Sequence, residues 1–295
     1  MLKIENIEVT GWEAAIRGMR NPMNSWEKSD SAYGCSDNDF CNHCSSSHHC
    51  TDRERTYLIG PNDLDLMKRL AKGGATHAKY RRMINVTMDI IAPLYFWKEF
   101  STYKVGTVAN SCSTMHKIQA NEFTLEDFSC EHLLTTVPLA PISINLTGPN
   151  HFISSRHFME LTCQILNHYR ELYLKTNDKE YWWQMIQLLP SSYNQRRTVQ
   201  LNYEVLSHIY FDRKDHKLDC WHTFCDMIRE LPYAQESITG EQDSDEDDAN
   251  SVDIKTSNIK FMEDGSVVIA GTKYVLEEKV KALESHIDTL VSIDT

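Results

Sequence analysis

Residues 83–94 (MINVTMDIIAPL) are mostly apolar and rich in β-branched side chains, a composition that favours a buried strand. Apolar residues at helical spacing precede this stretch at residues 62–72. Asp63 near its start and Gly73-Gly74 after its end are typical helix limits. We therefore expect an α+β fold in which helices pack against an antiparallel or mixed sheet.

The clearest helical pattern lies at residues 151–175, where six apolar side chains form one stripe: Phe158, Leu161, Ile165, Leu166, Tyr169 and Leu172. Residues 1–26 are predicted as a strand and a short helix, and residues 27–57 as a long loop. Four more helices are expected, the second of them ended by Pro190, at residues 94–104, 178–189, 197–212 and 216–231.

Composition places the chain among ordinary globular proteins, since 41% of its 295 residues are hydrophobic and 24% are charged. The net charge of −12 is partly local, because residues 236–253 contain eight carboxylates and no Lys or Arg. The charge balance indicates neither a nucleic-acid polymer nor a membrane as partner. No signal peptide and no apolar run of membrane-spanning length is visible, so a cytoplasmic protein is expected.

The chain is expected to fold as one domain over residues 1–234. Residues 235–258 have almost no apolar side chains and are predicted to be an acidic, disordered linker. Residues 259–295 are predicted as a hairpin with Asp264-Gly265 at its turn, followed by a helix. That helix has a heptad seam formed by Leu276, Val280, Leu283, Ile287 and Leu290. Self-association or docking through this seam and packing on the helix's own domain both remain open.

A cluster of thiols and imidazoles lies inside the predicted loop at residues 27–57. Four cysteines are interleaved with His43, His48 and His49, namely Cys35, Cys41, Cys44 and Cys50. This donor set matches a tetrahedral zinc site, and it predicts structural zinc. The alternative is a flexible loop of reduced, unligated thiols, which the odd total of nine cysteines also allows.

Two segments about ninety residues apart, residues 96–116 and 188–221, are dense in Arg, Lys, His, Asn, Tyr and Trp. Such side chains hold phosphates and flat heterocycles. Arg213 follows an apolar run and is expected to emerge at the edge of a packed helix, where it can fork onto a phosphate or a carbonyl. An ion pair with Asp212 or Asp215 is the structural alternative.

Together these segments resemble the two ligand-binding segments of the flavin-dependent thymidylate synthases. Residues 7–26 and 58–100 resemble that family's opening strand and helix and the stretch leading to its flavin motif, so the likeness covers roughly residues 7–232. The family motif is Arg-His-Arg, seven residues, then Ser. Counted from Ala92-Pro93, those positions hold Thr102, Tyr103, Lys104 and Cys112 here.

The resemblance implies a thymidylate-synthase-complementing type fold and the reductive methylation of dUMP to dTMP. It implies FAD as cofactor, methylenetetrahydrofolate and NADPH as co-substrates, and a homotetramer with sites between subunits. Cofactor-binding residues would be His77, Tyr103, Lys104, Asn202 and His208. Substrate-binding residues would be Glu99, Ser111, Cys112, Ser113, Arg196 and Arg213, with Arg213 also catalytic.

Several alternatives remain open at this point. The chain could be a nucleotide- or zinc-binding scaffold on the same fold, or it could carry out another uracil C5 modification such as hydroxymethylation. Cys112 is either a nucleophile or a small buried side chain. His77 lines the flavin pocket or lies at a helix end on the surface. Arg196 and Arg197 would point about 100° apart on a helix, so one could meet phosphate while the other meets solvent.

Overall fold

The computed structural model describes residues 2–35, 55–136, 142–144, 151–240, 259–261, 267–269 and 272–274. The chain divides into two units, residues 1–241 and 242–295. Within the described ranges, no helix is long and apolar enough to cross a membrane.

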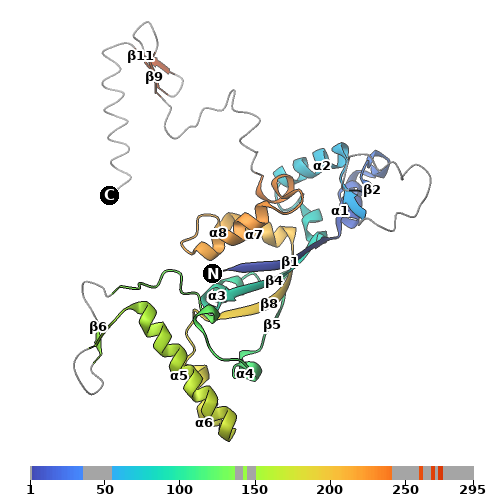
Figure 1. The fold of residues 1–295 in the computed structure, drawn as a ribbon. Coiled ribbons are helices and arrows are strands. Elements are labelled where there is room, and N and C mark those ends of the chain that lie inside the picture. Colours follow the sequence, from blue (N-terminus) through green and yellow to red (C-terminus); the bar gives the residue numbers. More distant parts are fainter. Residues whose placement is uncertain are drawn as a thin grey trace. The chain divides into compact units, whose positions relative to one another are not determined.

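The first unit is built on a four-stranded antiparallel sheet (Figure 1). Its strand order is β1 (Lys3–Thr10), β4 (Asn85–Pro93), β8 (Asn194–Asn202) and β5 (Val108–Ser111). The predicted buried strand is confirmed as β4, in which Val86, Met88 and Ile90 alternate along the inner face and are fully buried. The expected α+β class is thereby confirmed.

The helix predicted over residues 197–212 is wrong in its first part. Residues Asn194–Asn202 form the central strand β8, and helix α7 begins only at Tyr203 and ends at Arg213. Val199 and Leu201 alternate toward the core, as a strand requires, and β8 pairs with β4 on one side and β5 on the other. Consequently Arg196 and Arg197 point to opposite faces of the sheet.

Helices cover the inner face of the sheet and share one hydrophobic core with it. They are α1 (Trp12–Arg20), α2 (Pro61–Lys72), α3 (Leu94–Phe100), α7 and α8 (Asp219–Arg229). The short 3-10 helix η3 (Lys79–Met83) leads into β4. The centre of this core is aromatic, since Trp97, Tyr203, Tyr210 and Trp221 are almost completely buried. Burial of so much aromatic surface is the main stabilisation of this unit.

The first residues of the predicted linker are folded. Residues Gln235–Thr239 form a π-helical turn, η5, in which Ser237, Ile238 and Thr239 are buried. Ile238 extends the apolar pattern of α8, and the Ser207 hydroxyl donates to its carbonyl at 3.2 Å. These residues belong to the folded unit, and the remainder of the predicted linker lies outside the described residues.

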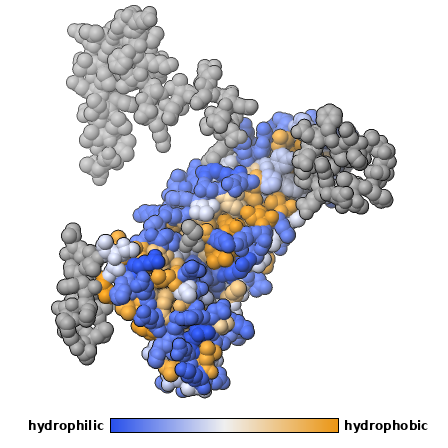
Figure 2. Space-filling model, viewed as in Figure 1, coloured by the Kyte–Doolittle hydropathy of each residue, from blue (hydrophilic) through white to orange (hydrophobic). Residues whose placement is uncertain are grey.

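A second, smaller cluster is formed by helices α5 (Ser155–Thr176) and α6 (Lys179–Leu188) with residues 118–130. This stretch follows the short α4 (Thr114–Lys117) and includes η4 (Leu125–Asp127). The core-facing side of α5 is Met159, Cys163 and Leu166. Phe158 and Ile165 of the predicted stripe are instead about half exposed. Figure 2 accordingly shows hydrophobic residues among hydrophilic ones in this region.

The remaining elements are short. The loop predicted over residues 27–57 is ordered at its ends, where β2 (Ala32–Cys35) pairs antiparallel with β3 (Arg55–Leu58). Two 3-10 turns, η1 (Asn21–Met23) and η2 (Trp26–Lys28), precede β2. Farther along the chain, β6 (Ile142–Ile144) pairs with β7 (His151–Ile153).

The second unit, taken by itself, contains three short strands in the antiparallel order β11–β10–β9. They are β9 (Ile259–Phe261), β10 (Val267–Ile269) and β11 (Thr272–Tyr274). The expected pairing across Asp264-Gly265 is therefore present between β9 and β10. The turn itself and the heptad helix lie outside the described residues.

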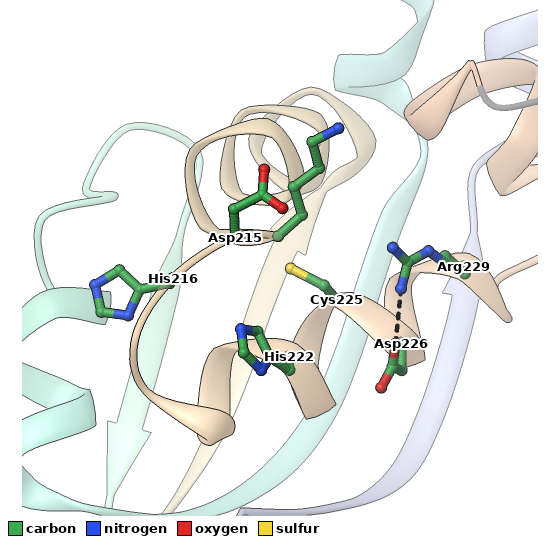
Figure 3. Close-up of a pocket in the computed structure, with 7 residues that line it drawn as sticks. Asp215, His216, His222, Cys225, Asp226 and Arg229 are labelled. Atoms are coloured by element: carbon green, nitrogen blue, oxygen red, sulfur yellow. Dashed lines mark hydrogen bonds and ion pairs between the residues drawn. The ribbon is translucent and has the colours of Figure 1, made fainter. Parts of the chain in front are cut away.

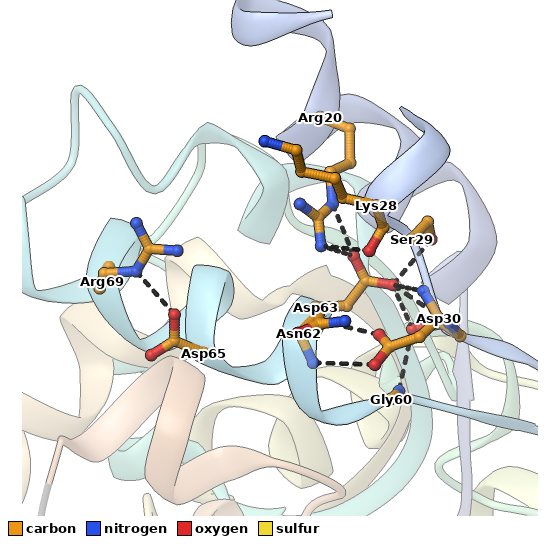
Figure 4. Close-up of polar contacts among 10 residues, drawn as sticks. Arg20, Lys28, Ser29, Asp30, Gly60, Asn62, Asp63, Asp65 and Arg69 are labelled. Carbon is orange, nitrogen blue, oxygen red and sulfur yellow. Dashed lines mark hydrogen bonds and ion pairs between the residues drawn. The ribbon is translucent and has the colours of Figure 1, made fainter. Parts of the chain in front are cut away.

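A buried carboxylate joins α1, α2 and the segment before β2 (Figure 4). Asp63 is fully buried, and its Oδ1 accepts from Nε and Nη2 of Arg20 at 2.8 and 2.7 Å. Its Oδ2 accepts from the hydroxyls of Ser29 and Ser31, both at 2.7 Å, and from two backbone N–H groups. All lone pairs of this carboxylate are thus used, which fixes where the chain enters β2.

Candidate functional site

Five side chains from α3, α7, α8 and the adjoining loops meet at the edge of the aromatic core: Glu99, Tyr103, Arg213, His216 and Trp221. We call this group the Glu99–Arg213 site. One oxygen of Glu99, Oε2, accepts from Arg213 Nη1 at 3.1 Å and from Trp221 Nε1 at 2.7 Å, and His216 Nε2 lies 3.4 Å from it. These contacts fix the orientation of the carboxylate.

Arg213 is held on two further sides. Its Nε donates to the Tyr103 hydroxyl at 2.9 Å, and that hydroxyl donates to Asp212 at 3.2 Å. The guanidinium carbon lies 4.8 Å from the Trp221 ring centroid and 5.6 Å from that of Tyr103, within cation–π range. Burial raises the pKa of the Tyr103 phenol above its usual value although Arg213 opposes this, so the phenol remains a neutral donor.

Glu99 and Arg213 each keep one polar atom that the contacts described above do not use. Among the described residues, neither Arg213 Nη2 nor Glu99 Oε1 has a hydrogen-bond partner. The two side chains are 19% and 34% exposed, so both atoms can be reached from solvent. The site therefore offers one donor beside one acceptor, which complements an N–H group next to a carbonyl.

A cleft of about 500 Å³ adjoins this site through His216 (Figure 3). The cleft is lined by the end of α7, the loop that follows and α8, through Lys214, Asp215, His216, His222, Cys225, Asp226 and Arg229. Its volume lies in the range of small-molecule sites. Within the cleft, Arg229 donates to Asp226 at 2.7 Å, so these two charges already neutralise each other in part.

A second polar group lies at the start of α7. Glu204 is 5% exposed, and neither of its carboxylate oxygens has a hydrogen-bond partner in the described part of the chain. Three basic groups surround it at longer range, Arg82 at 3.8 Å, Arg81 at 4.0 Å and His208 at 3.7 Å. A buried carboxylate without hydrogen bonds is costly and needs an explanation.

Among solved structures, thymidylate synthase X (ThyX) from Helicobacter pylori with FAD and dUMP aligns with a TM-score of 0.50 at 12% identity, over 81% of this chain and 98% of that chain. The UMP/dUMP methylase PolB from Streptomyces cacaoi bound with 5-Br UMP aligns with a TM-score of 0.46 at 11% identity, over 81% and 95%. No family model and no curated protein sequence matches. This chain has the fold of the flavin-dependent thymidylate synthases.

The likeness seen in the two polar segments is thus confirmed at the level of the fold. Of the residues that the resemblance to flavin-dependent thymidylate synthases selected, the structure brings three into direct contact, namely Glu99, Tyr103 and Arg213. The partner of Arg213 is Glu99 rather than Asp212 or Asp215. His216 and Trp221 complete the site and were not selected as ligand residues, because no local signal marks them as partners of Glu99.

The predicted flavin residues of the thymidylate synthase fold are otherwise spread out. His77 is exposed in the loop after α2, and Lys104 is exposed in the loop after α3. Asn202 caps α7 by accepting from the Val205 N–H at 3.1 Å, and its Nδ2 lies against Gly106. In the described part of the chain, no hydrogen bond or ion pair joins these groups to the Glu99–Arg213 site, and their flavin role stays a prediction.

The predicted substrate residues at the end of β5 are ordered by the backbone. Ser111 lies opposite Arg197 in the sheet, and the Cys112 N–H donates to the Arg196 carbonyl at 2.9 Å. Ser113 caps α4 by accepting from the His116 N–H. Cys112 is exposed, so the alternative of a small buried side chain is wrong.

Arg196 lies on the outer face of the sheet, where its Nη2 contacts Asp89 at 2.8 Å and Glu5 at 3.3 Å. Hydrogen bonds from Thr198 and Arg196 hold the pKa of Asp89 well below its usual range. The guanidinium is thus committed to carboxylates of its own chain, and the structure does not bring it to the Glu99–Arg213 site.

The predicted zinc ligands fall almost entirely outside the described residues. Cys35 is the last residue of β2, while Cys41, Cys44 and Cys50 are not described. Among the residues that the structure describes, no group of three or more His, Cys, Asp or Glu side chains is placed to hold a metal. Zinc therefore remains a prediction from the sequence.

Proposed function

We propose that this chain is a flavin-dependent enzyme that methylates C5 of the uracil ring of dUMP. The observation that carries the proposal is the free donor of Arg213 beside the free acceptor of Glu99, on the fold of a ThyX that was solved with FAD and dUMP. Uracil has an imide edge, in which an N–H lies between two carbonyls. Its N3–H would donate to Glu99 Oε1, and one carbonyl would accept from Arg213 Nη2.

Arg213 would also serve the chemical step. When C5 attacks a one-carbon electrophile, negative charge develops on the uracil carbonyl, and a fixed guanidinium at that oxygen stabilises the charge. Trp221 and His216 hold Glu99 Oε2, and Tyr103 holds Arg213 Nε, so both groups are oriented before the substrate arrives. This preorganisation avoids a rearrangement during the reaction.

The start of α7 offers polar groups to a bound flavin. Gly106 has a positive φ of 79°, and a Cβ there would lie 2.9 Å from Asn202 Nδ2, so glycine lets this amide pack directly against the backbone. Glu204 beside it is buried, without a hydrogen bond among the described residues, and lies 3.7 Å from His208. Asn202 and exposed His208 would hold the ring edge, and exposed Lys104 a phosphate. The flavin would supply the electrons that reduce the transferred carbon unit.

The remaining partners are proposed from the family resemblance. They are methylenetetrahydrofolate as carbon donor, NADPH as reductant and a homotetramer with shared sites. A scaffold that binds a nucleotide without catalysis is the second candidate. It is favoured by one observation, that Thr102, Tyr103 and Lys104 replace Arg-His-Arg and leave one cation where the motif has two arginines.

We expect the purified protein to bind flavin, because Asn202 and His208 offer polar groups to its ring edge and the fold is that of a ThyX solved with FAD. Its absorption spectrum should show the flavin bands near about 375 and 450 nm, either as purified or after addition of FAD and removal of the excess. The bands should disappear from the protein fraction after denaturation and filtration. Absence of bands in both preparations would remove the enzyme proposal and leave the nucleotide-binding scaffold.

A further inference from the structure

Arg197 is held in place on the inner face of β8, opposite Ser111 at the end of β5. Its guanidinium carbon lies 4.3 Å from the ring centroid of Trp97, which is itself 2% exposed. The Trp97 indole N–H donates to the Gln195 carbonyl at 3.0 Å, so the ring beneath the guanidinium is fixed. Stacking of this kind orients a guanidinium without using its hydrogen-bond donors.

A buried amide fixes the other side of Arg197. Its Nε donates to Gln195 Oε1 at 3.0 Å, and Gln195 Nε2 donates to the Cys112 carbonyl at 2.7 Å. Gln195 is 8% exposed and has little freedom. The side chain of Arg197 is therefore held by two contacts that leave the outer edge of its guanidinium, Nη1 and Nη2, pointing away from both.

That outer edge has no partner in the part of the chain that the structure describes. No carboxylate there forms an ion pair with Arg197, whereas Arg20 is paired with Asp63 and Arg196 with Asp89. Burial lowers the pKa of Arg197, but the guanidinium stays charged at neutral pH. A half-buried arginine without a counter-charge is unfavourable unless an anion joins it.

Ser111 supplies a third donor at the same place. It is the cross-strand partner of Arg197 in the β5–β8 ladder, and directly opposite residues share a face of the sheet at about 5 Å between their Cβ atoms. Ser111 is exposed, and among the described residues its hydroxyl has no partner. Two guanidinium nitrogens and one hydroxyl suit the three terminal oxygens of a phosphate monoester.

We infer that Arg197, with Ser111, is a binding site for a phosphate monoester. Trp97 and Glu99 are two residues apart on α3 and so do not face each other, which places this site apart from the Glu99–Arg213 site. The inference goes beyond the proposed function, because a phosphate group can be tested without the reaction. Two of the proposed ligands carry such a group, dUMP at its 5′ position and NADPH at its 2′ position.

The test is calorimetry with inorganic phosphate at constant ionic strength, on the full chain and its variants. We expect Arg197→Gln to weaken phosphate binding roughly tenfold to a hundredfold, since a bidentate charge-assisted contact is lost. Arg17→Gln removes the same charge from an exposed arginine paired with Glu13 and should leave binding unchanged. Arg197→Lys keeps the charge but loses the fork, so it should also bind more weakly.

Two further pairs of ligands identify the source of the phosphate. If dUMP is the ligand, the preference for dUMP over deoxyuridine should collapse in Arg197→Gln. If NADPH is the ligand, the preference for NADPH over NADH should collapse instead. The inference is overturned if the wild-type chain does not bind phosphate in preference to chloride. It is overturned equally if a folded Arg197→Gln or Arg197→Lys variant binds phosphate as the wild type does.

Discussion

Replacing Arg213 with alanine is expected to weaken dUMP binding by roughly 2–3 kcal/mol, or about 30- to 150-fold in Kd. The substitution removes the donor to the uracil carbonyl. It also removes the positive charge that pairs with the Glu99 carboxylate. Glu99 Oε2 then keeps only the Trp221 and His216 contacts of the three observed. The effect should therefore appear in both affinity and turnover.

Calorimetry with dUMP measures this effect directly, and Arg17→Ala is the matched control. Arg17 carries the same charge in an exposed ion pair with Glu13 and lies outside both the Glu99–Arg213 site and the cleft beside it. Arg213→Lys separates charge from geometry, because a lysine cannot contact Glu99, Tyr103 and a ligand through one planar fork. Unchanged dUMP affinity in a folded Arg213→Ala variant would remove Arg213 from the site.

Replacing Asp63 with alanine is expected to lower the free energy of unfolding by about 3–5 kcal/mol. Arg20 is 5% exposed, and without Asp63 its guanidinium would remain buried with no counter-charge. The hydroxyls of Ser29 and Ser31 would lose their acceptor as well. A loss of this size is a large share of the stability of an ordinary domain.

Urea denaturation followed by tryptophan fluorescence measures the loss, and Asp65→Ala is the control on the same helix. Asp65 forms an exposed ion pair with Arg69, so its removal should cost less than about 1 kcal/mol (Figure 4). Equal losses in the two variants would show that the buried network does not stabilise the fold.

The same carboxylate predicts the pH dependence of stability. Burial opposes ionisation of Asp63, but hydrogen bonds from Ser31, Ser29 and Arg20 outweigh it, so its pKa is lowered. The stability that Asp63 contributes is therefore present above the pKa of an unfolded aspartate, about 4, and is lost as pH falls through the lower folded value. Asp63→Ala should lack this part of the acid dependence.

Strong local patterns were sufficient to predict much of the fold. The apolar run at residues 83–94 is β4, and the helical spacing at residues 62–72 is α2. Strand β8 was missed because its pairing partners lie far away in the sequence, between 86 residues (Ser111 with Arg197) and 117 residues (Asn85 with Asn202). The turn at residues 235–239 was missed because its polar residues are buried by tertiary contacts with Tyr80 and Ser207.

The residues of the candidate site were likewise predictable only in part. Arg213 was predicted to be a ligand residue from its position after an apolar run and from the family resemblance. Its partner Glu99 is 114 residues away, and no local pattern distinguishes it from Asp212 or Asp215 as the counter-ion. Arg197 can be separated from the ion pair that Arg196 forms with Asp89 only when β8 is a strand, because adjacent residues then face opposite sides of the sheet.

The most direct measurement of the central claim is the affinity of the chain for dUMP compared with dCMP. Uracil presents an N3–H to Glu99 and a carbonyl to Arg213, whereas cytosine has no hydrogen on N3 and has an amino group in place of one carbonyl. We expect dUMP to bind at least about a hundredfold more tightly, because bound dCMP would cover the Arg213 donor and the Glu99 acceptor and leave both unpaired. Equal affinities, or no binding of dUMP at millimolar concentration, would contradict the account.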